Sequence, residues 1–169
     1  MRILGSVLVV LLLMASGGCA GEKSDPGTQE EAGLDALRSA KPAMTSAVSA
    51  SSSTFGGNHL PCGLHNETFE YDISGGLIGD AASWRNGIDA LTTELADAGW
   101  ALKDTVDDHS VAGTREGLEL FVQRQERTDE GVVWRVSLTG PCVAFSDEGA
   151  DQARQQGVVD LSGDLSGDR

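Results

Sequence analysis

One segment of the sequence carries a continuous apolar stripe at helical spacing, and this segment limits what the rest of the chain can build. In the range 80–98, apolar residues follow at intervals of four, three, four and three: Trp84, Ile88, Leu91, Leu95 and Ala98. That spacing places them on one face of an α-helix. Asp80 is suited to cap the first turn, and Gly99 to end the last. The stripe must be buried against another element, and we expect a sheet.

Four segments near this helix alternate apolar and polar residues with a period of two, which is typical of strands with one buried face. They cover residues 68–73, 100–106, 118–123 and 132–139. Ser74-Gly75-Gly76 is expected to end the first strand. The stretch 128–131 (TDEG) is expected to be a tight turn that joins the last two strands into a hairpin. The ranges 51–57 and 107–116 read as loops.

The length of the chain indicates one domain, and its acidic charge argues against two classes of partner. The chain has 169 residues, with 12 Lys and Arg against 26 Asp and Glu, and a formal net charge of −14. The length fits one domain with tails. The acidic balance argues against nucleic-acid binding, which needs a basic surface. It also disfavours spontaneous adhesion to anionic lipids, so any contact with a membrane requires a dedicated anchor.

The first residues have the three-part layout of a secretory signal. Arg2 precedes an unbroken apolar run from Val7 to Met14, which is too short to span a bilayer, and small residues follow at positions 15–18. Cys19 comes next. The stretch 14–19 (MASGGC) resembles a bacterial lipobox in the glycine-rich form common in actinobacteria, with Ser16 where the usual motif has Leu.

The lipobox resemblance implies that residues 1–18 are a lipoprotein signal peptide. Cys19 then becomes the first mature residue and carries diacylglycerol on its thiol. Two or more acyl chains anchor a protein stably to a membrane. The mature chain keeps 11 basic and all 26 acidic residues. The alternative is a plain secretory signal with an incidental cysteine.

The expected pairing of the other two cysteines depends on the lipidation of Cys19. If Cys19 is acylated, Cys62 and Cys142 are left in an exported chain, and a disulfide between them is the simplest account. It would close a loop of about 80 residues and stabilise the fold by roughly 4 kcal/mol in the chain-entropy model. A zinc or copper site at His59, Cys62 and His65 is the alternative, although that spacing is not an established zinc pattern. We expect no metal and no cofactor.

The disulfide also predicts the topology. It would place the start of the strand at 68–73 beside the end of the strand at 132–139, so these two are expected to be antiparallel neighbours. Together with the hairpins this gives a four-stranded antiparallel sheet of order 1-4-3-2. The helix at 80–98 and an N-terminal helix are expected to cover one face. The fold class is therefore α+β, a two-layer sandwich.

The predicted domain covers residues 30–146. Before it, residues 19–29 are polar and are expected to form a flexible tether. The range 30–39 favours a helix that Pro42 interrupts, with a second short helix possible over 43–50.

After the domain, residues 147–169 are acidic and are expected to be disordered. Two alternatives stay open there. One is a short helix over 147–156. The other is a calcium loop in the repeated Asp-Leu-Ser-Gly of residues 160–168, although this lacks the EF-hand pattern.

The sheet face that points away from the helices is expected to be polar, and either simply solvated or engaged by a partner. Its candidate binding residues are Lys103, Arg124 and Arg135, which mix with further polar residues: Glu70, Asp72, Glu119, Gln123 and Ser137. A flat face of mixed charge would favour a protein partner. A pocket lined by tryptophan would instead indicate a small-ligand binder; the candidates are Trp84, Trp100 and Trp134.

Common catalytic motifs, such as the serine elbow, the P-loop and the zinc-protease helix, do not occur in the sequence. Asp107-Asp108-His109 is a grouping that a hydrolase could use, but no nucleophile with a supporting motif accompanies it. The sequence therefore predicts a protein that is not an enzyme.

The order of helix, Cys62-Gly63, strand, long helix with Trp84 and strand meander is similar to mycobacterial LppA-like lipoproteins over residues 19–145. More broadly, signal, tether and small domain resemble small actinobacterial cell-envelope lipoproteins of uncharacterised function. The resemblance implies location rather than activity. We expect a membrane-anchored, extracytoplasmic binding or accessory module whose partner is an envelope protein or a small ligand. A structural or regulatory partner of another envelope protein is the alternative.

Overall fold

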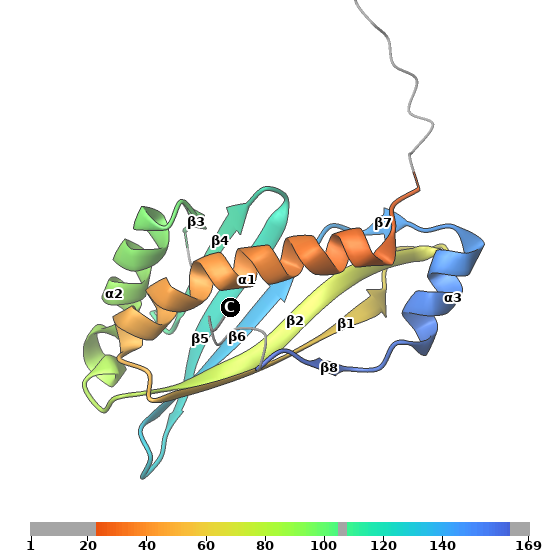
Figure 1. Cartoon of the computed structure of the whole chain (residues 1–169). Coiled ribbons are helices and arrows are strands. Elements are labelled where there is room, and N and C mark those ends of the chain that lie inside the picture. The colour runs from red at the N-terminus through yellow and green to blue at the C-terminus, as the bar shows by residue number, and fades with distance from the viewer. Residues whose placement is uncertain (1–22, 105–107, 163–169) are drawn as a thin grey trace, which may run out of the picture.

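The computed structural model describes residues 23–104 and 108–162. In chain order its elements are α1 (Pro26–Val48), β1 (Ser52–Pro61), β2 (Thr68–Gly79), α2 (Ser83–Asp97), β3 (Ala101–Lys103), β4 (Ser110–Arg115), β5 (Leu118–Arg127), β6 (Val132–Thr139), β7 (Val143–Ala144), α3 (Asp147–Gln155) and β8 (Val159–Asp160). The described strands form one sheet of eight, and Figure 1 shows α1 crossing it, with α2 near one end of the sheet and α3 at the other. The class is α+β.

The expected four-stranded sheet of order 1-4-3-2 is wrong. The strands follow the order β3-β4-β5-β6-β2-β1-β8, their pairs are antiparallel, and β7 pairs with the start of β2. The neighbour relations β2–β6 and β5–β6, which the sequence predicts, are present. However, β4 lies between β3 and β5, and β1 and β8 extend the sheet beyond β2.

β1 occupies a range in which the sequence predicts a loop. Its inward positions are Phe55, Gly57 and His59, so a single large apolar residue marks the alternation. The ring of Tyr71 fills the space beside Gly57, where a Cβ would lie 2.3 Å from the Tyr71 hydroxyl oxygen. A side chain from the neighbouring strand therefore replaces the missing one. The sequence pattern fails to reveal β4 for a similar reason, because Val111 is the one large apolar residue of that strand.

β2 also runs further than the sequence predicts, through Gly75 and Gly76 to Gly79. The Phe55 ring of β1 packs across Gly75, where a Cβ would lie 2.5 Å from the Phe55 Cδ1 atom. Glycine inside a strand often marks such a close approach rather than a turn. The longer strand provides the register on which β6 pairs along its whole length.

α1 is one continuous helix through Pro42, where the sequence predicts an interruption. Leu37 before the proline and Met44 and Val48 after it are on the same buried face, while Pro42 is exposed. Packing of this face on the sheet outweighs the hydrogen bond that proline removes. The helix begins at Pro26, so residues 26–29 belong to it rather than to a tether.

α2 closely matches the helix predicted over 80–98. Its first turn begins beside Asp80, whose carboxylate accepts a hydrogen bond from Ser83 N at 2.8 Å. Its last turn is followed by Gly99 with a φ of 87°, a left-handed conformation that favours glycine. Leu91 and Leu95 are buried in the core, but Trp84 is 36% exposed.

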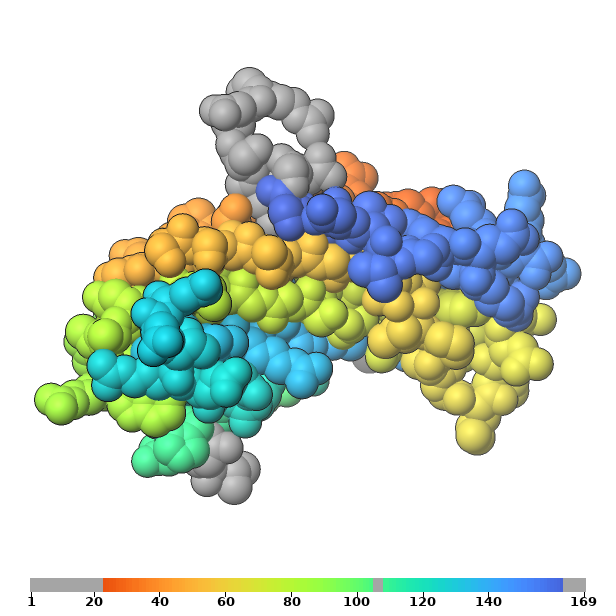
Figure 2. Space-filling view, turned by 90° about the horizontal axis from the view of Figure 1, so that it is seen from below, coloured from red at the N-terminus to blue at the C-terminus, as the bar shows by residue number. Residues whose placement is uncertain are grey.

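The C-terminal region belongs to the domain as far as residue 162. α3 and β8 occupy the first part of the range expected to be a disordered tail. β8 pairs with Gly56 and Gly57 of β1, and Leu161 is fully buried. Figure 2 shows this segment, in blue, along one side of the molecule. Residues 163–169, and with them most of the possible calcium loop, lie outside the described residues.

The core lies between the helices and one face of the sheet. Its inward strand residues include Ile73, Leu77, Leu120, Val122, Val136 and Leu138, and its helix residues include Leu37, Met44, Leu91 and Leu95. The outward positions of the same strands are exposed or half-buried, apart from Ser110. We call this outward surface of strands β1 to β6 the open face.

Candidate functional site

The open face is built from rows of side chains that cross the sheet. The row through the middle joins Lys103, Ala112, Phe121, Ser137, Ser74 and Gly56 on successive strands. A second row joins Ala101, Thr114, Glu119, Thr139, Asp72 and Asn58. In both rows the side chains are larger on β5 than on β1. The larger outward side chains of these rows therefore lie over β5, which we call the raised region, and the smaller ones lie over β1, on what we call the shallow side.

The part of the open face over β2 and the end of β6 carries a carboxylate held by hydroxyl groups. Thr139 Oγ1 donates to Asp72 Oδ1 at 3.0 Å, and Ser137 Oγ approaches the same oxygen at 3.5 Å. Partial burial and the nearby charge of Asp72 raise the pKa of Glu70, which lies on the same face. This part of the open face is acidic and is suited to a donor or a cation on a partner.

The raised region carries an exposed aromatic ring beside charged groups. Phe121 is 40% exposed although it lies in mid-strand. Lys103 Nζ lies 2.8 Å from Glu119 Oε1, an exposed ion pair at the side of the ring. Arg135 is exposed on the adjacent strand. Sequence reasoning left Phe121 out of the candidate residues, although the alternation of β5 already places it outward.

Arg124 is not part of the open face, contrary to the sequence prediction. Positions 118, 120 and 122 of β5 point inward, and position 124 falls on the same side. Its guanidinium lies 4.6 Å from the centroid of the Trp84 ring and donates to the Trp84 carbonyl oxygen. Of the three candidate cations, Lys103 and Arg135 remain on the open face.

A hollow of about 400 Å³ lies where the open face meets β8. It is lined mainly by small residues of β1 and β2 and by the end of the chain, namely Thr54, Phe55, Gly56, Ser74, Gly75, Val158, Asp160 and Ser162. Asp160 accepts a hydrogen bond from Ser162 N at 2.9 Å, and this bond lowers the pKa of Asp160. The hollow continues the shallow side of the open face.

His109 lies at the opposite end of the domain from α3, beside Arg124 and Trp84. Its Nε2 atom is 3.2 Å from Asp108 Oδ1, and its Nδ1 atom contacts the Arg124 guanidinium. The side chains of Asp108 and His109 are largely exposed. Asp107, the other acid of the predicted grouping, lies outside the described residues.

The tryptophans do not meet around a ligand pocket. Trp134 is fully buried and its indole Nε1 donates to Ser83 Oγ at 3.2 Å. Trp100 is also in the core, while Trp84 lies at the surface under Arg124. Two of the three rings are therefore structural.

The histidines and cysteine of the possible metal site do not converge. Cys62 forms a disulfide with Cys142, with a Cα–Cα distance of 5.9 Å, consistent with the pairing expected from the sequence. His59 is buried, whereas His65 lies exposed in the loop that follows Cys62. Within residues 23–104 and 108–162, no group of three or more His, Cys, Asp or Glu side chains is arranged to hold a metal ion.

A buried polar cluster joins α1, β1, β2 and the end of α3, and sequence reasoning missed it. His59 Nδ1 lies 3.1 Å from Gln156 Oε1, and Gln156 Nε2 donates to Glu30 Oε2 at 3.2 Å. The Tyr71 ring packs on His59 with centroids 4.8 Å apart. His59 Nε2 and the Tyr71 hydroxyl are buried without a hydrogen-bond partner among the described residues. No local sequence signal links these residues, which come from four separate elements.

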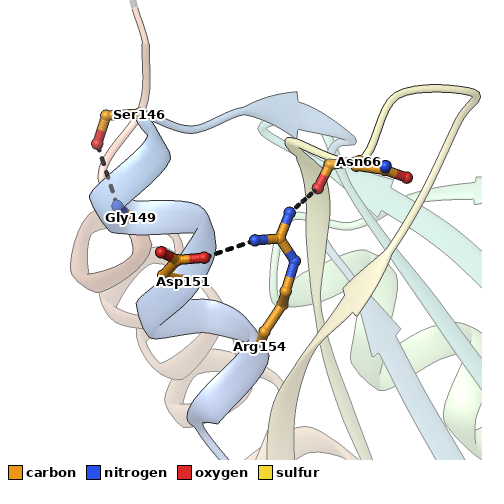
Figure 3. Close-up of polar contacts among 5 residues, drawn as sticks. All are labelled: Asn66, Ser146, Gly149, Asp151 and Arg154. Atoms are coloured by element: carbon orange, nitrogen blue, oxygen red, sulfur yellow. Dashed lines mark hydrogen bonds and ion pairs between the residues drawn. The ribbon is translucent and has the colours of Figure 1, made fainter.

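α3 is fastened to the loop between β1 and β2, as Figure 3 shows. Arg154 lies 2.7 Å from Asp151 Oδ1 on its own helix and donates to the Asn66 carbonyl oxygen. Ser146 caps the helix by accepting from Gly149 N at 3.1 Å. The disulfide lies at the same end, so this loop is held from two sides.

Cys19 and the predicted signal peptide lie outside the described residues. In the part of the chain that the structure describes, no helix is both long and apolar enough to cross a membrane. Comparison of the chain with models of protein families, with curated proteins and with solved structures finds no match in any of the three.

Proposed function

We propose that this protein is a non-catalytic accessory module of the cell envelope, anchored through lipid on Cys19, whose open face binds another envelope protein. The anchor is supported by the signal layout and by the resemblance of residues 14–19 to a lipobox. A disulfide is typical of exported proteins and agrees with that location. The open face is the observation that carries the binding role.

The open face offers room for a protein interface of modest size. Its six strands side by side span about 24 Å, at about 4.8 Å between neighbours. The eight residues of β6 extend about 26 Å. Because β3 and β4 are shorter, the area is at most about 600 Å², which is less than the roughly 800 Å² per partner of a standard interface and is typical of smaller, transient ones.

The chemistry of the open face also fits a protein partner. Phe121 offers an exposed aromatic ring, and aromatic residues are enriched at protein interfaces. Arg135 supplies positive charge on one side, where the Lys103–Glu119 ion pair adds both signs, and Asp72 supplies an acceptor on the other. A partner with a complementary charge pattern gains specificity and a faster association rate.

The other candidate functions have less support. A small-ligand pocket lined by tryptophan is disfavoured because Trp100 and Trp134 are core residues. A hydrolase at His109 is disfavoured because both ring nitrogens face Asp108 and Arg124 at an exposed site. Neither arrangement places a nucleophile beside a base.

Site-specific photocrosslinking in intact envelopes tests the binding role. p-Benzoylphenylalanine replaces Phe121 on the open face, and in a matched control it replaces Thr93, which is exposed on α2. We expect a discrete crosslinked protein from position 121 and none from position 93. Mass spectrometry then identifies the partner, and a reciprocal pull-down checks it.

A charge reversal adds a second readout. Arg135→Glu changes the open face without touching the core, so folding should be unaffected and the yield of the crosslink should fall several-fold. If position 121 gives no product, or if both positions give the same product, the open face is not the binding surface.

A further inference from the structure

The chain enters the domain beside the loop that joins β1 and β2. Ser24 N donates to the Ala144 carbonyl oxygen at 3.0 Å, and Ser24 forms a parallel bridge with Phe145. Ala144 in turn pairs with Thr68, the first residue of β2. Ser24 is therefore about two strand spacings, roughly 10 Å, from the start of β2. Residues 62–67, which we call the end loop, lie immediately before it.

The connection from a lipid on Cys19 to this point is short whatever its conformation. Ser24 is five residues along the chain from Cys19, and each step spans at most about 3.6 Å, so Ser24 lies within about 18 Å of the lipidated residue. By contrast, α1 is 23 residues long and extends roughly 35 Å to the other end of the domain. A lipid anchor on Cys19 would therefore hold the end loop near the bilayer. The tether expected to reach residue 29 ends at residue 24, which makes the connection about half as long.

The end loop presents an apolar side chain from a fixed backbone. Leu64 is 99% exposed at its tip. Thr68 Oγ1 donates to the His65 carbonyl oxygen at 2.8 Å, and the disulfide and Arg154 hold the two sides of the loop. Figure 3 shows how the Arg154 side chain reaches across from α3 to the loop. A side chain on a preorganised loop loses little conformational freedom on binding.

Charge decides how closely this end approaches the membrane. Acids predominate near the end loop, namely Asp25, Glu67, Asp147, Glu148 and Asp151, against Lys23 and Arg154. An anionic bilayer repels these acids and the acidic domain behind them. Burial of one leucine is too weak to bring such a protein from solution, but a tether supplies a high effective concentration. The contact is therefore expected at the tip alone.

We propose that the end loop, with Leu64 at its tip, is the surface that contacts the lipid bilayer when Cys19 is lipidated, and that the opposite end of the domain points away from it. This inference rests on the proposed lipid anchor. Because the strands run between the two ends, the open face then stands roughly upright on the membrane. Another membrane protein could reach it from the side.

Vesicles with a chemical anchor test this orientation. The disulfide leaves Cys19 as the one free thiol of the mature chain, so it can be coupled to a maleimide lipid in vesicles that contain brominated phosphatidylcholine and phosphatidylglycerol. Leu64→Trp is compared with Asp129→Trp, which lies in the β5–β6 turn at the far end. The unsubstituted chain gives the background from native tryptophans. Bromine quenching is expected to be several-fold stronger at position 64 than at position 129.

Two further measurements sharpen the result. Inserting about twenty Gly and Ser residues after Cys19 adds a root-mean-square reach of roughly 25 Å and should weaken the quenching at position 64. Raising the salt concentration screens the repulsion between the acidic domain and phosphatidylglycerol, so it should strengthen the quenching at position 64.

Absence of quenching at position 64, or equal quenching at both positions, would overturn the proposed orientation. The coupling bypasses cellular lipidation, so this failure differs from failure of the anchor itself, which fractionation of cells with and without Cys19 detects.

Discussion

The hydroxyl of Tyr71 lies in the core, where the tyrosine is 1% exposed and the hydroxyl has no hydrogen-bond partner among the described residues. Burial, with a smaller effect of the Glu30 charge, raises the pKa of Tyr71 to about 12. The hydroxyl also occupies the space that a side chain at position 57 would need. It explains why glycine stands there, but contributes no hydrogen bond of its own.

Tyr71→Phe is expected to leave the free energy of unfolding at pH 7 unchanged or to raise it by up to about 1 kcal/mol, because it removes an unsatisfied buried polar group. Denaturant unfolding measures this change. A loss of more than 1 kcal/mol would mean that the hydroxyl makes a hydrogen bond in solution.

The same residue predicts an alkaline effect. In the unfolded chain tyrosine loses its proton near pH 10, whereas in the fold it keeps the proton to about pH 12. The native state therefore binds more protons between these values, and stability falls as pH rises through them, by up to about 2.7 kcal/mol. Unfolding curves from pH 9 to 12 should show this fall in the natural chain. The fall should be smaller in Tyr71→Phe; identical curves would contradict the prediction.

The candidate site shows what alternation along a strand does and does not predict. The period of two correctly places Asp72, Lys103 and Arg135 on the open face. The same alternation, continued along β5 from Leu118, Leu120 and Val122, places Arg124 on the helix side. The sequence therefore already contained the signal that Arg124 does not belong to the open face. The cluster around His59 was not predictable, because its members meet through contacts between distant elements.

At the scale of elements, α1 keeps a proline in its interior. Pro42 is exposed, so the missing hydrogen bond and the steric conflict with the preceding turn are not compensated by burial of its ring. The helix persists because its apolar face packs on both sides of this position.

Pro42→Ala is therefore expected to stabilise the protein by about 1–3 kcal/mol, the lower end reflecting the greater freedom that alanine allows the unfolded chain. Ser46→Ala, a nearby exposed helix position, is the matched control and should stay within about 0.5 kcal/mol of the natural chain. Thermal and denaturant unfolding measure both. A destabilised Pro42→Ala would show that the proline has a packing role.

Secondary structure was predictable where each element carries its own apolar pattern. α2, β5 and β6 do, and the sequence predicts them within a few residues. β1 and the second half of β2 do not, because Phe55 and Tyr71 cover glycines on the neighbouring strand. Because of such cross-strand pairs, neither strand shows a regular alternation of apolar and polar residues in its own sequence. The same holds for β8, which is two residues long and is fixed by pairing with β1.

At the scale of the whole molecule, the disulfide fastens the end loop to the segment between β6 and β7. It closes a loop with a sequence separation of 80. Reduction is therefore expected to lower the free energy of unfolding by roughly 4 kcal/mol in the chain-entropy model. Denaturant unfolding with and without dithiothreitol measures this, and the Cys62→Ser/Cys142→Ser double variant should match the reduced protein. Equal stability of the oxidised and reduced forms would contradict a structural role.

The central proposal is that lipid on Cys19 anchors the chain to the outer side of the cell membrane and that the Cys62–Cys142 disulfide cross-links the domain. Fractionation of cells that produce the natural chain or Cys19→Ser tests it most directly. The account predicts that the natural chain sediments with membranes, that Cys19→Ser appears in the soluble exported fraction, and that neither carries a thiol that reacts at position 62 or 142. Continued sedimentation of Cys19→Ser with membranes, or a reactive thiol in the exported product, would contradict it.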